Sequence, residues 1–177
     1  MVSAFLQKYK PVLWFILRFF GIYTVLTFLY SLFLKPFESH PDTITQWVAG
    51  QSSMLVNVTG LAAETLTVAN ENFVRFWING THVANVVEGC NSVSVLILFT
   101  TFVLAFKGPA KATVLFLLAG MASIYLVNLL RIGILAIGIY KFPQYTELLH
   151  QVVFPVIIYG YVFLLWMWWV NKFSLKK

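Results

Sequence analysis

Four apolar runs constrain this chain more than any other feature of its sequence. They cover residues 12–34, 90–106, 112–140 and 152–170. A helix needs about 20 apolar residues to cross a bilayer. In lipid the backbone N–H and C=O groups must bond to one another, which a helix achieves within one segment. The chain is 60% hydrophobic and only 10% charged, whereas a soluble domain carries about a quarter charged residues. The sequence therefore predicts an all-α polytopic membrane protein with four transmembrane helices.

The basic residues indicate how these helices are oriented. One set comprises Lys8, Lys10, Lys107, Lys111, Lys172, Lys176 and Lys177, and the opposite set comprises only Lys35, Arg75 and Lys141. Loops rich in lysine and arginine stay in the cytoplasm. We therefore expect both termini to be cytoplasmic and segments 35–89 and 141–151 to lie outside. The first run has no small-x-small cleavage site, so we interpret it as a retained signal anchor.

Charge and cysteine content exclude several classes of protein. The net charge is +6, but the basic residues are scattered along the chain. They form no basic stripe of the kind that binds nucleic acid, so we expect the lipid bilayer and no nucleic acid as a partner. The single cysteine, Cys90, rules out an internal disulfide and a CxxC metal motif. We predict no metal and no cofactor.

Segment 35–89 is the one part that resembles a small folded unit outside the membrane. The expected elements are a surface helix at 43–58 and strands at 65–68, 73–78 and 81–87. Asn79-Gly80 lies between the last two strands, and this dipeptide is the strongest short signal for a β-hairpin. The chain therefore divides into a cytoplasmic start and first helix (1–34), an extracytoplasmic segment (35–89), and a core of three transmembrane helices with a basic tail (90–177).

Three residues with reactive or charged side chains fall at the same predicted depth in the membrane. Cys90 begins the second run at its outer end, and His150 directly precedes the fourth run. Arg131 comes 19 residues after Ala112, which is about 28 Å along a helix and close to the hydrocarbon thickness. All three residues are thus expected at the outer face of the membrane.

These three groups suit thiol catalysis. A cysteine attacks as its thiolate, which a nearby cation or imidazolium favours. His150 could move the proton as general acid and base, and Arg131 could hold a developing oxyanion or the substrate carbonyl. Supporting candidates near them are Glu88, Asn91 and Asn128.

Each of these residues also has a simpler interpretation. A lone membrane cysteine is often structural. An arginine near a helix end often extends toward the lipid headgroups. A histidine in a short outer loop is commonly a solvated surface residue. The sequence alone leaves both interpretations open.

The same residues resemble a known family. Three motifs are similar to those of the exosortase/archaeosortase family, most of all to those of the small exosortase F type of Bacteroidetes. They are Glu88-Gly89-Cys90-Asn91-Ser92 at the start of a helix, Asn128-Leu129-Leu130-Arg131-Ile132 late in the next helix, and His150 before the last helix. The resemblance implies that Cys90 is the nucleophile, with Arg131 and His150 as its basic partners. This chain has Cys90-Asn91-Ser92 where many members have Cys-Ser-Gly or Cys-Ala-Gly, and fewer spans than the larger members.

The resemblance also implies an activity. Members are membrane-embedded cysteine transpeptidases or proteases, which cleave C-terminal sorting signals through a thioester acyl-enzyme at the outer face of the bacterial inner membrane. Their substrates are membrane-anchored proteins ending in a short motif, a transmembrane helix and a basic tail. Two alternatives stay open. One is a non-enzymatic assembly factor that binds a partner through the outer hairpin, and the other is a small transporter using Arg131.

Overall fold

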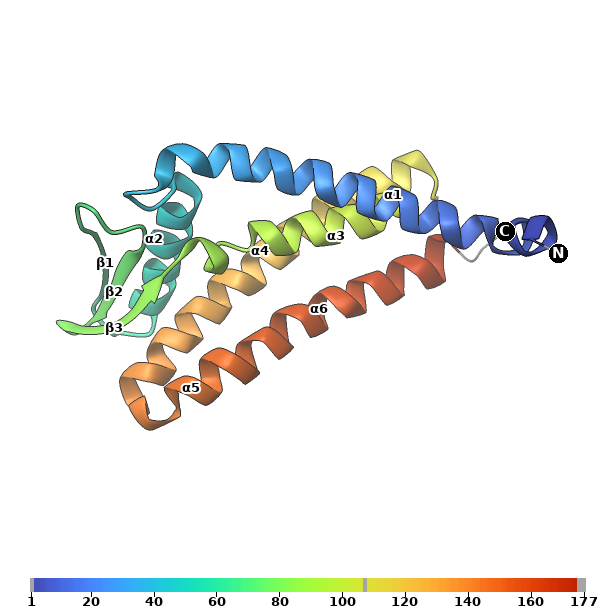
Figure 1. The fold of residues 1–177 in the computed structure, drawn as a ribbon. Helices are drawn as coiled ribbons and strands as arrows, with labels where there is room; N and C mark the ends of the chain where they lie inside the picture. The colour runs from blue at the N-terminus through green and yellow to red at the C-terminus, as the bar shows by residue number, and fades with distance from the viewer. Residues whose placement is uncertain (1, 107, 175–177) are drawn as a thin grey trace.

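The computed structural model describes residues 2–106 and 108–174. Four apolar helices run side by side along its length (Figure 1). They are α1 (Val2–Leu34), α3 (Val93–Ala105), α4 (Ala110–Lys141) and α6 (Phe154–Trp169). The start of α1 and the end of α6 share one end of the molecule, and a small sheet with helix α2 forms the other. Lys107, Lys176 and Lys177, which entered the prediction of topology, lie outside the described residues.

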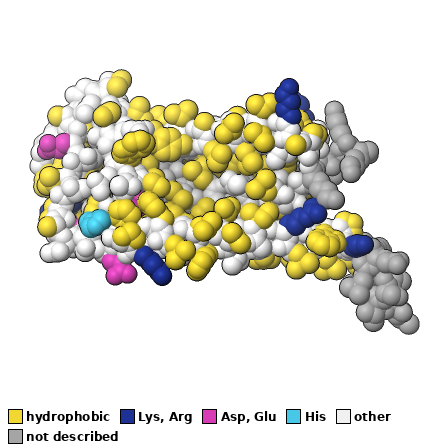
Figure 2. Space-filling view, turned by 90° about the horizontal axis from the view of Figure 1, so that it is seen from above, with side chains coloured by type: hydrophobic (Ala, Val, Ile, Leu, Met, Phe, Trp, Pro, Cys, Tyr) yellow, Lys and Arg dark blue, Asp and Glu magenta, His cyan; other side chains and the backbone are white. Residues whose placement is uncertain are grey.

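Three helical segments are long and apolar enough to cross a membrane. They are Tyr9–Phe37, Ala110–Lys141 and Pro143–Phe173, and no residue in the most apolar window of the first is fully buried within the protein. Figure 2 shows hydrophobic side chains covering the middle of one face, with charged side chains gathered toward its two ends. This pattern is typical of a protein that turns its middle toward lipid. The structure thus confirms a mostly helical protein with three of the four expected candidate spans.

The second expected span is shorter than the apolar run from which it was predicted. The helix α3 has 13 residues, or about 20 Å of rise, against a hydrocarbon thickness of about 30 Å. The reason lies at its start. The segment Glu88–Cys90 forms a 3₁₀ turn, and Ser92 adopts the left-handed conformation with φ 65°. The α-helix therefore begins only at Val93.

Segment 35–89 folds largely as expected. The helix α2 spans Thr43–Val58, with Asp42 as its N-cap. A three-stranded antiparallel sheet follows in the order β1-β2-β3, and its strands are Ala63–Thr67, Val74–Ile78 and Thr81–Val86. Asn79 and Gly80 both have positive φ, at 49° and 74°, as a type I′ hairpin turn requires. The predicted hairpin is therefore confirmed, and β1 joins it as a third strand.

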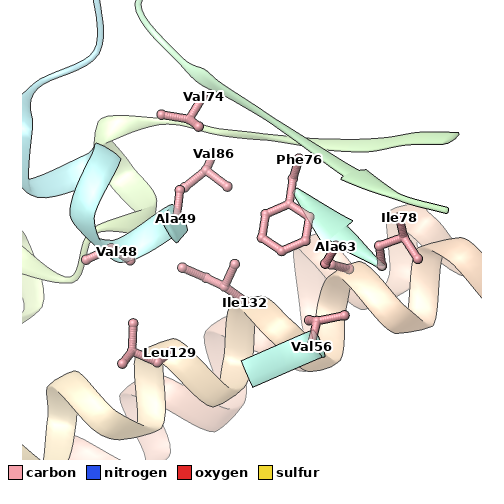
Figure 3. Close-up of a cluster of buried hydrophobic side chains, with 11 residues drawn as sticks. Val48, Ala49, Val56, Ala63, Val74, Phe76, Ile78, Val86, Leu129 and Ile132 are labelled. Atoms are coloured by element: carbon pink, nitrogen blue, oxygen red, sulfur yellow. The ribbon is translucent and has the colours of Figure 1, made fainter. Parts of the chain in front are cut away.

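One hydrophobic core joins the sheet to a membrane helix. It holds Val48, Ala49 and Val56 of α2, Ala63, Val74, Phe76, Ile78 and Val86 of the sheet, and Leu129, Ile132 and Ala136 of α4. Figure 3 shows Phe76 and Ile132 directed into this cluster from opposite sides. The second half of α4 is thereby fixed against the sheet and α2.

A second core holds the helices together at the other end. Phe99 of α3, Phe116 of α4 and Trp169 of α6 are all buried in it. Gly120 lets α3 approach α4 closely, since a Cβ atom there would lie 2.2 Å from Cζ of Phe99. Among the long helices, α1 packs mainly on α3, through ring contacts such as that between Phe15 and Phe102.

The link from α4 to α6 is irregular. It comprises the 3₁₀ turn Pro143–Tyr145, the short α5 (Thr146–Leu148) and the π-helical turn Leu149–Val153. This link lies at the same end of the molecule as the sheet (Figure 1). The two segments expected outside the membrane therefore share one end.

Candidate active site

The three residues singled out from the sequence line a single cavity. Cys90, Arg131 and His150 all border it, and its volume is about 550 Å³. The other lining residues come from β2, from β3 and the turn after it, from the start of α3, from α4, from α5 and from α6. Segments far apart in the sequence thus meet around one space at the sheet end of the helices.

Cys90 ends the 3₁₀ turn that links the sheet to α3, and its thiol is free and half-buried. Its backbone is held at both polar groups. The N–H donates to the carbonyl of Val87 at 2.8 Å, and the carbonyl accepts from Nδ2 of Asn128, also at 2.8 Å. The hairpin and α4 therefore fix the backbone of Cys90 from two sides.

Arg131 lies one turn after Asn128 on α4 and is partly buried. Its Nε atom is fully buried, and no hydrogen-bond acceptor for it exists among the described residues. A buried donor without a partner costs about 1–3 kcal/mol.

His150 lies in the π-helical turn before α6 and is solvent-exposed. A π-turn widens the helix by one residue and is frequent at functional sites. His150 borders the cavity together with Thr146 of α5 and Phe154 of α6, which lie on either side of it in the chain. An exposed imidazole at a cavity edge can exchange protons with water.

The three supporting candidates occupy different environments. Glu88 is exposed at the start of the 3₁₀ turn. Asn128 is fully buried and holds the carbonyl of Cys90, while its Oδ1 has no partner in the described part of the chain. Asn91 is buried too, and its Oδ1 accepts from the N–H of Val93 at 2.9 Å. Asn91 and Asn128 thus shape the backbone around Cys90, whereas Glu88 is exposed and interacts with the hydroxyl of Tyr30.

A polar network behind Cys90 was not foreseen from the sequence. Nδ2 of Asn91 donates to the hydroxyls of Tyr30 at 2.9 Å and Thr45 at 3.1 Å. Thr45 in turn donates to the buried carboxylate of Asp42. The network joins α1, α2 and the cysteine turn. An aspartate just before a helix is a recognisable N-cap, but no signal in the sequence pairs Asn91 with Tyr30.

No group of three or more His, Cys, Asp or Glu side chains that could hold a metal ion exists within residues 2–106 and 108–174. A comparison with protein-family models, with curated proteins and with solved structures finds no match to this chain. Any assignment of chemistry therefore depends on the site itself. It offers a thiol, an imidazole and a guanidinium around one cavity, which are a nucleophile, a general acid–base group and an oxyanion donor in chemical type.

Proposed function

We propose that the chain is a membrane-embedded cysteine transpeptidase or protease that cleaves C-terminal sorting signals of exported proteins. The observation that carries this proposal is the convergence of Cys90, Arg131 and His150 on one cavity. These residues come from three segments separated by 41 and 19 positions. A structural cysteine needs neither a cation nor an imidazole beside it.

The proposed reaction has two steps. His150 accepts the thiol proton of Cys90, and the sulfur attacks the scissile carbonyl carbon while Arg131 donates to the developing oxyanion. The C–N bond breaks, the leaving amine takes the proton from His150, and a thioester remains. An amine or a water molecule then attacks the thioester and restores the thiol. An amine gives transpeptidation, and water gives proteolysis.

The membrane setting supports this chemistry. We infer that α3, together with the turn before it and the residues after it, makes a fourth crossing, with both termini in the cytoplasm and the cavity at the outer face of a bacterial inner membrane. The exposed apolar sides of α1 and α6 would face lipid and the transmembrane helix of the substrate. Docking of that helix would deliver the scissile bond at a fixed depth, and positioning of this kind lowers a barrier by several kcal/mol.

The resemblance of the motifs around Cys90, Arg131 and His150 to exosortases favours the same activity. The alternative is a non-enzymatic assembly factor that binds a partner through the hairpin of β2 and β3. The exposed side chains near the turn, such as Thr81 and His82, would then carry the function. This alternative predicts that the thiol is dispensable.

The test compares C-terminal peptides of membrane and surface proteins, by mass spectrometry, in cells of the source organism that carry the wild-type chain or Cys90→Ala. We expect a protein ending in an apolar helix and a basic tail to lose that end only in wild-type cells. Arg131→Ala should abolish the loss, and His150→Ala should reduce it strongly. A Thr81→Ala variant is the matched control, since this residue lies on the hairpin away from the cavity.

Two further measurements complete this test. Immunoblots of membranes establish that each variant is inserted at the wild-type level. Intact-mass analysis of the wild-type chain searches for a substrate fragment joined to Cys90 through a thioester. Unchanged processing in a well-expressed Cys90→Ala strain would refute the proposal, and loss of processing in the Thr81→Ala strain would favour the assembly factor.

A further inference from the structure

The wall of the cavity next to Cys90 is formed by the last strand of the sheet and the residue after it. Five successive residues, 83–87, all line the cavity. Side chains alternate between the two faces of a strand, so a face would contribute only every second residue. Because all five successive residues line the cavity, we infer that it lies along the backbone edge of this segment and not against one of its faces.

This edge has no neighbouring strand. The sheet order is β1-β2-β3, and within the described part of the chain β3 pairs with β2 alone. The outer N–H and C=O groups of an edge strand are free to pair with another extended chain. The strand also leads directly to the nucleophile, since β3 ends at Val86 and Cys90 follows four residues later.

The cavity wall also includes a complementary donor. The guanidinium of Arg131 is partly buried and its Nε has no acceptor in the described part of the chain, and Arg131 lines the cavity together with Cys90. A peptide backbone offers carbonyl oxygens to this donor and both kinds of polar group to the edge of β3. A lipid acyl chain could fill the same apolar space but would satisfy neither.

We propose, on the basis of the proposed function, that the substrate binds here as a fourth strand of the sheet. The residues before its scissile bond would pair with residues 83–87, and the scissile carbonyl would lie at Cys90. The strand β3 runs toward α3 (Figure 1). A substrate that continues into its own transmembrane helix runs in the same direction, so the added strand is parallel to β3.

This binding mode has a consequence for recognition. Main-chain hydrogen bonds supply affinity, and only alternate side chains of an added strand meet the protein surface. The segment before the scissile bond should therefore be recognised mainly through its backbone. A short extended peptide without the native sequence should bind measurably.

The test uses the full chain in detergent micelles and a reactive peptide. The probe is an acetylated tetrapeptide of alternating valine and threonine that ends in a vinyl sulfone, whose vinyl carbon forms a bond with the thiol of Cys90. Four analogues carry one N-methyl group each, on successive amides. Intact-mass spectrometry measures the rate of labelling, and iodoacetamide reports the reactivity of the thiol without peptide binding.

We expect labelling by the parent peptide to saturate with concentration. N-methylation at every second amide should slow labelling about fivefold or more, because it removes one hydrogen bond to β3. N-methylation at the amides between them should slow labelling less than twofold. Labelling that does not saturate, or equal effects at all four positions, would overturn the fourth-strand binding mode. Labelling that methylation leaves unchanged at every position would instead favour a lipid or another apolar occupant.

Variants of the strand give an independent measurement. Adjacent residues of an edge strand direct their N–H groups to opposite sides of the strand. Only one of Ala84 and Asn85 therefore has its N–H on the outer side. Replacing that residue with proline removes the outward donor and is tolerated. That variant should slow peptide labelling at least fivefold and leave iodoacetamide labelling within twofold. The matched control is Thr67→Pro on β1, at the other edge of the sheet, which should slow neither. The N–H of Ala63 bonds to Asn57 and not to β2, so by alternation the N–H of Thr67 also points away from β2.

The outcomes separate this inference from the proposed function. If Cys90→Ala blocks processing in cells but methylation has no alternating effect, only the fourth-strand binding mode fails. If Cys90→Ala leaves processing unchanged, the proposed function fails whatever the peptides do.

Discussion

Replacing Gly120 with alanine tests the packing that brings the cysteine turn onto α4. A Cβ atom at this position would lie 2.2 Å from Cζ and 2.7 Å from Cε1 of Phe99. Carbon atoms pack at about 3.5–4.0 Å, so the ring would have to move by more than about 1 Å. Phe99 is fully buried, and its ring centroid lies 5.7 Å from that of Phe116. The ring has little space to move away, so α3 must separate from α4.

The size of the effect follows from two opposing contributions. Overpacking of this severity costs about 3 kcal/mol, while the better helix propensity of alanine returns about 1 kcal/mol. The net loss of about 2 kcal/mol corresponds to a decrease of about 4–8 °C in Tm for a chain of this size. Thermal unfolding in detergent, followed by tryptophan fluorescence, measures this decrease.

Two variants serve as controls for Gly120→Ala. A Cβ atom at Gly160 on α6 would meet nothing within 4 Å, so Gly160→Ala should leave Tm unchanged or raise it. Adding Phe99→Leu to Gly120→Ala should recover part of the loss, so that the double variant is more stable than the sum of the single effects implies. A Gly120→Ala variant that melts at or above the wild-type temperature would refute the reasoning.

Three further predictions concern the surroundings of Cys90, each checked by the same melting assay. Ser92→Gly should raise Tm by about 2–4 °C, because glycine relieves the left-handed strain and removes a buried hydroxyl that lacks a partner in the described structure; a decrease would contradict this. Asp42→Ala should cost about 1–2 kcal/mol, since it removes the N-cap of α2, whereas Asp42→Asn should keep most of the stability. Asn128→Leu should cost about 1 kcal/mol by leaving the carbonyl of Cys90 without its donor, and a Tm equal to wild type would show that water replaces it.

The sequence predicted local structure well where a short signal determines it. The surface helix at 43–58 has the expected bounds, and Asn79-Gly80 forms the expected turn. The third apolar run was expected at 112–140 and forms a helix at Ala110–Lys141. In each of these cases the signal is contained within the segment itself, as the spacing of its apolar residues, the length of its apolar run or a turn dipeptide.

Other features depend on contacts between segments and could not be read from any one of them. The apolar run from residue 90 gave no sign that α3 would begin only at Val93, because Ser92 adopts its strained conformation within the buried network of Asn91. Depth along the membrane predicted that Cys90, Arg131 and His150 would share a level. That they also border one cavity depends on how α4 and α6 pack against the sheet.

The shared core of the sheet and α4 also determines the order in which the protein can be completed. Domains fold as the chain is made, from the N-terminus onward. Residues 43–86 are synthesised well before Leu129, Ile132 and Ala136, which close their core. The face of the sheet and α2 that packs on α4 therefore stays uncovered until the second half of α4 is in place. The same step places Arg131 at the cavity that Cys90 borders, so the two residues share that cavity only once α4 is complete.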